Sequence, residues 1–550
     1  MLSVTLCAQS NGEASIKIAP DLQLAISGLD SGLADEDVDV IVQFQPTANF
    51  RAALSRLSRR SSRTRTQSEL SLIHSAMVRV PLSELNQLAG SADVIYVSPD
   101  RTIQPTLDHA RAATQTDAVW NMGLGGAKVR VAVIDSGITV NEAFAGGANS
   151  SRIVYAKSFV PGVASTNDGY GHGSHVASII GGDGEGSNMA AAKLRGIAPY
   201  VELVNLRVLD DNGEGKDSAV VAALQFIVNN QRSSSDLKIR VVNLSLGRDV
   251  YETYRNDPLC KAVEAVWNAG ITVVVAAGND GRLNVNNNQG YGTINSPGND
   301  PYVITVGAVN SKKTNTRTDD SMTTYSSKGP SAIDHIVKPD LVAPGNRITA
   351  FATGRLKINN PSNIVDPVNS YMELSGTSMA TPFVSGAVAI LLGEDNSLTP
   401  DQIKVKLMMS AWKGLPATTK VIDPLTKNSY TVNNDIFTSG AGYLDVYAAL
   451  SNTFDTDLDA ISPSAKIDSK TGKVKLVVPK NVVWGDVKLP KNVVWGDKIN
   501  GDQVVWGDQV VWGDSSKKTL NVVWGDQSIF GCSKSEIVLG EANKTLIKGE

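Results

Sequence analysis

The chain has 550 residues, 42% of them hydrophobic, so it is long enough to form two or three folded units. Its 51 basic and 55 acidic residues leave a formal net charge of −4, which provides no broad basic surface, and we expect no binding to nucleic acid. Three widely separated cysteines, Cys7, Cys260 and Cys532, indicate neither a disulfide framework nor a clustered zinc site. The sequence contains no run of eighteen apolar residues, so it predicts no membrane-spanning helix.

Residues 1–37 form an N-terminal segment whose first ten residues contain a short apolar stretch without a basic start. This stretch fits either the remnant of an export signal or an ordinary chain end. Residues 38–106 then show the pattern of a compact α+β domain. We expect strands at 38–44, 76–80 and 94–97, and helices at 68–72 and 81–89.

Residues 107–452 alternate between apolar strands and helices, which predicts an α/β fold with a mainly parallel sheet covered on both faces. The expected strands are short and β-branched, and they lie at 129–134, 201–208, 239–246, 271–277 and 303–309. Helical length and spacing are found at 217–230 and 258–268.

Three segments of this domain carry residues suited to nucleophilic catalysis. Asp135 ends the strand at 129–134, where a parallel sheet presents its carboxyl edge. His172 stands in Gly-His-Gly-Ser-His, before an apolar helix. Ser378 stands in Ser-Gly-Thr-Ser-Met-Ala-Thr-Pro, where a turn leads into another apolar helix, so its hydroxyl is expected near a helix N-terminus. We expect Pro382 to be tolerated because it falls in the first turn of that helix.

In the order Asp, His, Ser, these segments closely resemble the subtilisin-like serine protease family, with supporting matches at 196–199, 243–247, 277–279 and 338–345. The resemblance implies a subtilisin-like three-layer fold and a serine endopeptidase that works through an acyl-enzyme. It assigns the nucleophile to Ser378, proton transfer to His172, and orientation and charge stabilisation of the imidazole to Asp135. Asn279 matches the residue whose amide helps to form the oxyanion hole.

The resemblance also implies a groove in which a peptide strand lies between two extended segments. One segment is Ser245, Leu246 and Gly247, and the other runs from Gly213 to Gly215. The walls of the pocket for the residue before the cleaved bond are expected at Ala276, Ala277 and Gly278, with Asn295 near its base. Asp217 stands where many family members carry an aromatic residue in the pocket four residues before that bond, so we expect no strong aromatic preference there.

The family's structural calcium sites are not clearly reproduced in this sequence. Neither 141–147 nor 181–193 contains the expected ligands, although Asp183 and Glu185 offer carboxylates. Structural calcium therefore stays possible without an assigned site, and the chemistry itself requires no cofactor. His175, three residues after His172, is expected to be a packing residue rather than a second catalytic or metal-binding histidine.

Residues 38–106 resemble the family's propeptide, an inhibitor domain that helps the enzyme to fold and occupies its groove until it is cut. The resemblance implies that the chain is a proenzyme whose own propeptide is an intramolecular inhibitor, with protein and peptide substrates. A first cleavage is expected between about Gln104 and Ala110. Such an enzyme is expected to be secreted or associated with the cell envelope.

Residues 453–550 form a tail in which Val-Val-Trp-Gly-Asp occurs five times, with tryptophans at 484, 495, 506, 512 and 524. Three interpretations remain open: a module that binds the cell surface or substrate, a β-rich appendage that stabilises the enzyme, and a weakly ordered tail. We expect truncation after about Ser462 to preserve hydrolysis of small peptides.

Two alternatives to an exported protease are a catalytically silent subtilisin-like scaffold and an intracellular processing protease. A silent scaffold is expected to lack a catalytic or oxyanion residue, and none is missing. The propeptide-like domain argues against an intracellular enzyme.

Overall fold

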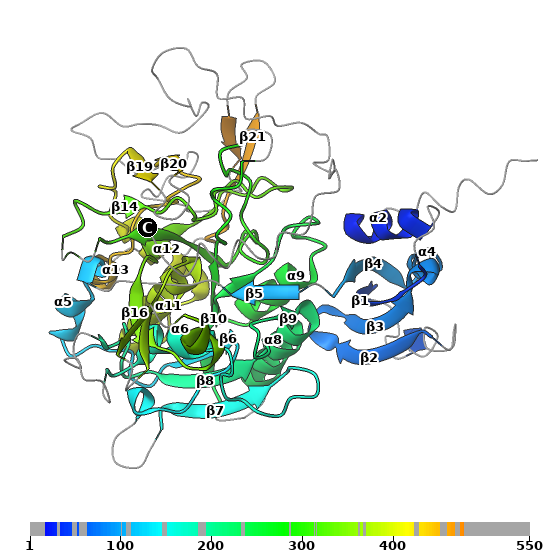
Figure 1. Ribbon diagram of the computed structural model, residues 1–550, viewed down its shortest axis with the longest axis horizontal. Helices are drawn as coiled ribbons and strands as arrows, with labels where there is room; N and C mark the ends of the chain where they lie inside the picture. Colours follow the sequence, from blue (N-terminus) through cyan, green and yellow to red (C-terminus); the bar gives the residue numbers. More distant parts are fainter. Residues whose placement is uncertain are drawn as a thin grey trace, which may run out of the picture.

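A computed structural model gives the fold of the chain, with a small domain beside a larger one (Figure 1). The structure describes residues 17–29, 34–46, 52–53, 63–100, 102–105, 112–145, 151–184, 194–232, 237–284, 288–312, 314, 316–360, 363–366, 370–422, 428–451, 459–467 and 474–477. The five tryptophans of the tail and its Val-Val-Trp-Gly-Asp repeats lie outside these residues.

The small domain is an antiparallel sheet with two helices on one face (Figure 1). In the order β2-β3-β1-β4, its strands are β2 (Arg65–Leu70), β3 (Ser75–Pro81), β1 (Asp37–Phe44) and β4 (Val94–Pro99). The helices are α2 (Pro20–Leu29) and α4 (Leu85–Ala89). Leu22 of α2 and Leu85 of α4 share a buried core with Val42 of β1. Helix α2, for which the sequence predicted no element, is therefore an integral part of this domain.

The helix expected at 68–72 is wrong. Strand β2 covers this stretch as far as Leu70, and a single 3₁₀ turn, Ser71–Ile73, follows. The strand pairs antiparallel with β3, and its side chains alternate between exposed and partly buried. Pairing with a neighbouring strand has outweighed a local helical preference, as is common where a sheet face is half buried.

The large domain is built on an eight-stranded sheet in the order β14-β13-β12-β10-β6-β8-β7, with β15 also paired to β13. In chain order, the strands are β6 (Arg130–Asp135), β7 (Ile153–Ser158), β8 (Glu202–Arg207), β10 (Ile239–Leu244), β12 (Thr272–Ala276), β13 (Ile304–Asn310), β14 (Ser321–Met322) and β15 (Leu341–Pro344). All neighbouring pairs are parallel except β13 with β14. The predicted α/β class with a mainly parallel sheet is confirmed.

Two pairs of helices pack on this sheet and complete a three-layer fold: α6 (His172–Gly181) with α11 (Thr377–Glu394), and α8 (Asp217–Arg232) with α9 (Pro258–Asn268). Helix α11 is long and apolar enough to cross a membrane, but 89% of that stretch is buried inside the described part of the protein. It packs against β10, β12 and β13 and is the central helix of the core.

Shorter elements surround this core. A three-stranded sheet contains β16 (Ile348–Phe351), β18 (Tyr371–Leu374) and β17 (Ile364–Asp366), and β19 (Thr418–Ile422) and β20 (Ser429–Asn433) form a hairpin. The remaining elements are α5 (Thr116–Trp120), α10 (Gly354–Asn359), α12 (Pro400–Ser410), α13 (Val446–Ser451), β21 (Ser464–Ile467) and β22 (Val474–Val477).

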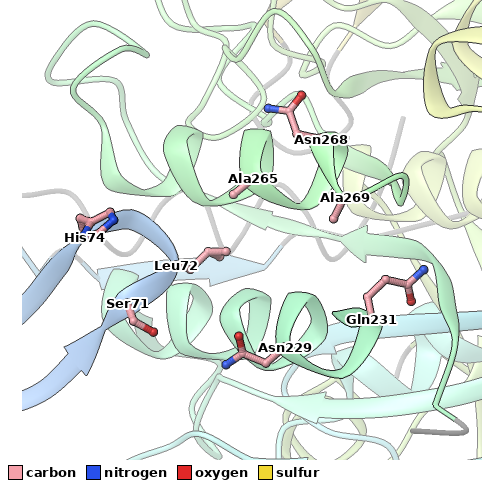
Figure 2. Close-up of a pocket in the computed structure, with 8 residues that line it drawn as sticks. All are labelled: Ser71, Leu72, His74, Asn229, Gln231, Ala265, Asn268 and Ala269. Carbon is pink, nitrogen blue, oxygen red and sulfur yellow. The ribbon is translucent and has the colours of Figure 1, made fainter. Parts of the chain in front are cut away.

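The second face of the small sheet lies against α8 and α9. Ile41 and Leu70 belong to the core of the large domain rather than to that of their own domain. The Nζ atom of Lys216 lies 2.9 Å from a carboxylate oxygen of Asp39, which ties the two domains by an ion pair. The junction leaves a cavity of about 710 Å³ between the turn after β2, which contributes Leu72 and His74, and the C-terminal ends of both helices (Figure 2).

Residues 459–467 pack onto the large domain. The Ser462 hydroxyl donates a hydrogen bond to Asp340 Oδ1 at 2.6 Å and accepts one from Lys404 Nζ at 2.9 Å, and all three residues are buried. The backbone N–H of Ala465 donates to the carbonyl of His335 at 2.8 Å. The domain boundary expected at residue 452 therefore falls too early, and a cut after Ser462 would remove part of this packing.

We predict that a chain ending at residue 455 is less stable than one ending at residue 480, both carrying Ser378→Ala to prevent self-digestion. The shorter chain leaves Asp340 and Lys404 buried without their serine partner. Hydrogen bonds to charged groups contribute about 1.5 to 3 kcal/mol each, so losing the two bonds of Ser462 is expected to lower the free energy of unfolding by about 3 to 6 kcal/mol. Denaturant unfolding measures it, and equal midpoints and slopes for the two chains would contradict the prediction.

Candidate active site

Three neighbouring parallel strands, β6, β10 and β12, end at the same edge of the sheet. Asp135 is the last residue of β6, Ser245 follows β10, and Asn279 follows β12 by three residues. Because parallel strands present their carboxyl ends together, these three residues gather at one edge. The site is therefore positioned by the most buried part of the fold.

Asp135 and His172 form a buried pair at this edge. Neither side chain is exposed, and His172 Nδ1 lies 2.6 Å from Asp135 Oδ1. The same carboxylate oxygen accepts a hydrogen bond from the backbone N–H of Ser136 at 2.7 Å. A buried carboxylate needs such donors, so the proton of the neutral imidazole belongs on Nδ1, which leaves Nε2 available as a base.

Gly171 allows His172 to begin helix α6 at this position. Its φ angle is +111°, and a Cβ atom there would lie 1.9 Å from the carbonyl oxygen of Thr353. Only glycine fits this conformation and this close approach.

Ser378 is the second residue of helix α11 and is fully buried. Its hydroxyl donates to the carbonyl of Ser245 at 2.8 Å, and the Ser245 hydroxyl donates to the carbonyl of Ser378 at 2.7 Å. This reciprocal pair places the serine at the sheet edge that also carries Asp135 and His172. The hydroxyl lies near a helix N-terminus, where developing negative charge is favoured.

Pro382 does not lie in the first turn of α11, so the expectation for it is wrong. It is the sixth residue of the helix and lies in the second turn. Proline lacks the N–H that would bond to the carbonyl four residues earlier, which is that of Ser378. That carbonyl accepts the Ser245 hydroxyl instead, and this bond accounts for the proline.

The Asn279 side chain is held by its oxygen alone. Its Oδ1 accepts a hydrogen bond from the backbone N–H of Thr377 at 2.9 Å. Its Nδ2 is buried and has no hydrogen-bond partner among the described residues. The Thr377 hydroxyl accepts from the backbone N–H of Gly278 at 3.1 Å, which fixes the loop that carries the asparagine. An oriented amide with free donors is suited to an oxygen that becomes negatively charged.

The predicted groove segments flank a strand of the same chain. Strand β5 (Thr102–Pro105) lies between β11 (Leu246–Gly247) and β9 (Gly215–Lys216), antiparallel to both (Figure 1). Pro105 pairs with Leu246 and Ile103 pairs with Gly215. Gly213 lies outside β9, in the preceding turn, where its N–H donates to the carbonyl of Asp210 at 3.1 Å.

Ala277, Gly278 and Asn295 lie together beside the oxyanion candidate. The backbone N–H of Asn295 donates to the carbonyl of Ala277 at 2.9 Å. Gly278 has φ +106°, and a Cβ atom there would lie 1.6 Å from Asn295 Oδ1, so the amide packs directly on the glycine. Burial and, to a smaller extent, the Asp249 carboxylate raise the pKa of the neighbouring Asp280 to about 6, although a hydrogen bond with Asn295 acts to lower it.

Asp217 is buried in an ion pair. It is the first residue of α8, and its carboxylate accepts from Arg248 Nε at 3.0 Å and from Nη2 at 2.9 Å. Burial acts to lower the pKa of the Arg248 guanidinium, but Asp217 and Asp257 outweigh it and raise that pKa well above its ordinary value. Asp217, which stands where many family members carry an aromatic residue, therefore has its charge balanced by Arg248.

His175 is a buried residue of α6 whose ring lies against backbone carbonyls. Its Nε2 lies 3.2 Å from the carbonyls of Ile348 and Met372, and burial, with help from His172, lowers its pKa to about 3. No group of three histidine, cysteine or acidic side chains that could hold a metal ion occurs in the described part of the chain.

One of the two carboxylates offered for calcium, Asp183, is paired with an arginine. The Asp183 carboxylate lies 3.4 Å from Arg152 Nη2, so a cation already faces it. Glu185 lies outside the described residues.

Sequence reasoning missed Ser136, Asp168 and Thr377, which hold the candidate residues in place. Thr377 immediately precedes Ser378, and Ser136 immediately follows Asp135, so both were visible within the motifs. Asp168 lies four residues before His172, and its only signal was a carboxylate in a glycine-rich loop.

Comparison with known proteins agrees with this geometry. The family model described as "Subtilase family" matches residues 126–442, more than half of the chain. "Serine protease AprX" of Bacillus subtilis (strain 168) is 31% identical over 393 residues, which cover 68% of this chain and 84% of the relative.

Two further relatives carry similar names. "Subtilisin DY" of Bacillus licheniformis is 31% identical over 56% of this chain and 92% of the relative. "Extracellular serine proteinase" of Thermus sp. (strain Rt41A) is 32% identical over 61% of this chain and 70% of the relative. The chain therefore belongs to the subtilase family and is a subtilisin-like serine endopeptidase.

Proposed function

We propose that Asp135, His172 and Ser378 are the catalytic triad of this endopeptidase. His172 Nε2 takes the proton of the Ser378 hydroxyl as the oxygen attacks the peptide carbonyl, and then gives it to the leaving amine. Water hydrolyses the resulting acyl-enzyme by the same proton transfers. The carboxylate of Asp135, 2.6 Å from His172 Nδ1, stabilises the imidazolium without taking up its proton.

Asn279 Nδ2 and the backbone N–H of Ser378 form the proposed oxyanion hole. The support is the free, buried amide nitrogen of Asn279, whose oxygen is fixed by Thr377. Donors aimed in advance at the developing charge stabilise the transition state without further reorganisation. This chemistry requires no cofactor.

We further propose that the chain is a proenzyme inhibited by its small domain, and the register of β5 is the observation that carries this. Leu246 pairs with Pro105 and Gly247 with Gln104, so β5 ends one residue before this register would reach Ser245. The carbonyl of Ser245 accepts the hydroxyl of Ser378. We therefore expect the first cut one residue beyond β5, between Thr106 and Leu107.

We propose that the protein acts outside the cytoplasm, in the medium or at the cell envelope. The Thermus relative, named an extracellular serine proteinase, supports the first of these. The groove pairs with the main chain of a peptide strand, which supports broad protein and peptide substrates. The tail with its five tryptophans is proposed to bind a surface or an insoluble substrate. Retention on cell walls, compared between the full chain and a chain ending at residue 480, tests the role of the tail.

Ser378→Ala should give a folded chain that keeps its small domain, whereas the wild-type protein should acquire Leu107 as its N-terminus. The serine that cuts substrates is also the one expected to cut the junction. Intact mass and N-terminal sequencing, after expression in a protease-poor host, measure both outcomes. A Ser378→Ala protein that matures at the wild-type rate would disprove the nucleophile, and a different N-terminus would disprove the register.

Asn279→Ala should lower kcat by about 10² to 10³ with little change in KM, the loss typical of removing one oxyanion donor from a subtilisin. The reason is that the amide acts mainly on charge that exists in the transition state. Steady-state kinetics on a soluble peptide measure the effect. A normal kcat with a raised KM would make Asn279 a ground-state contact instead.

The preference for lysine over norleucine before the cleaved bond should rise by about 2- to 5-fold as the pH increases from about 5 to about 7.5, a range typical of partly exposed charge pairs. The Asp280 carboxyl has a pKa of about 6, so it is mostly neutral below that pH and charged above it. The ratio of the two kcat/KM values cancels every titration that affects both peptides equally. Asp280→Asn should make this ratio independent of pH. A rise that persists in this variant would contradict the proposal that Asp280, which bonds to Asn295 near the expected base of the pocket, favours lysine there.

A further inference from the structure

Asp168 is a buried carboxylate that accepts hydrogen bonds from neighbours of both Asp135 and His172. It is 3% exposed and lies in the loop before helix α6. Its Oδ1 accepts from the backbone N–H of Gly171 at 2.6 Å and from the Ser136 hydroxyl at 2.8 Å. Its Oδ2 accepts from the backbone N–H of Ser174 at 2.7 Å. Each of these donors lies within two residues of Asp135 or His172.

Two of these bonds hold the start of helix α6. The first N–H groups of a helix have no partner inside the helix and need an outside acceptor. Gly171, the residue that caps α6, has no side chain to supply one. Asp168 supplies it to Gly171 and Ser174, on either side of His172, and its negative charge suits the positive end of the helix. The direction of the first turn, and with it that of the imidazole, is set by this carboxylate.

The third bond, from the Ser136 hydroxyl, links Asp168 to the end of the strand that carries Asp135. The Ser136 hydroxyl donates to Asp168 and accepts from the backbone N–H of Gly173 at 2.9 Å. The backbone N–H of Ser136 donates to the Asp135 carboxylate at 2.7 Å. Asp135 and His172 come from different elements 37 residues apart, and this hydroxyl joins the end of β6 to the first turn of α6.

We infer that Asp168 is a positioning residue for catalysis, which fixes the imidazole of His172 against Asp135 through the N-terminus of α6 and through Ser136. This inference rests on the triad proposed above. Among the described residues, the side chain of Asp168 accepts hydrogen bonds from Gly171, Ser136 and Ser174, which are all groups of the scaffold. Its loss should therefore misplace the base and lower the rate of the chemical step, while the groove still binds peptide with its usual affinity.

Asp168→Asn tests this with an isosteric change. Whichever way the amide is turned, its NH₂ group faces a backbone N–H that needs an acceptor, so one helix bond is lost. We expect kcat to fall by about 10- to 100-fold with KM within about 2-fold, as for small misplacements of a catalytic group. Both parameters are measured on fully processed protein, with active sites counted by a serine-directed phosphonylating reagent.

Asp445→Asn is the matched control. Asp445 is also a largely buried carboxylate that binds a backbone N–H at the start of a helix, that of Ala448 in α13 at 2.8 Å, and it pairs with Arg317 at 2.8 Å. This variant should lose a similar amount of thermal stability and keep the wild-type kcat. A wild-type kcat in Asp168→Asn, or equal losses of kcat in both variants, would overturn the inference.

A double variant tests whether Asp168 acts on catalysis through Ser136 or independently of it. Ser136→Ala removes the hydroxyl that Asp168 accepts, so the combined loss of kcat in Ser136→Ala/Asp168→Asn should be well below the product of the single losses. A combined loss equal to that product would refute the link through Ser136. The proposed triad fails by a different result, namely full peptidase activity in Ser378→Ala.

Discussion

The site depends on keeping one negative charge fully buried at the end of a parallel strand. The Asp135 carboxylate has no contact with water, so its charge must be balanced by donors that the fold places in advance. The backbone N–H of Ser136 and the ring N–H of His172 are those donors. Because the imidazole is needed for this balance, burial of the charge also determines that the proton of the neutral ring lies on Nδ1 rather than on Nε2.

The small domain and the groove can be understood from main-chain geometry. A peptide strand inserted between β11 and β9 satisfies backbone groups that would otherwise face water, whatever its side chains are. Strand β4 leads into β5 through two residues, and the first of these, Asp100, accepts from the backbone N–H of Ser218 at 2.7 Å. The small domain is therefore anchored at the start of α8 immediately before its chain enters the groove.

Local patterns in the sequence predicted most of the large domain, because its parallel strands are buried on both faces and appear as short β-branched runs. The residues of the candidate triad could also be found, because each stands in a short sequence motif. What the sequence could not give depends on distant partners. Strand β2 forms because it pairs with β3. Asp168 is linked to the site through Ser136, which lies 32 residues away in the sequence. Ser462 is buried because its hydroxyl bonds to Asp340 and Lys404.

Pro382 changes how Ser378, the proposed nucleophile, is connected to the rest of the fold. By withholding one N–H, it makes helix α11 exchange an internal bond for a bond to Ser245, whose own carbonyl accepts the Ser378 hydroxyl. The first turn of the helix is thus fastened to the wall of the groove rather than to the turn that follows it. A displacement of that wall must therefore carry Ser378 with it, which keeps the serine hydroxyl aligned with the groove segment that begins at Ser245.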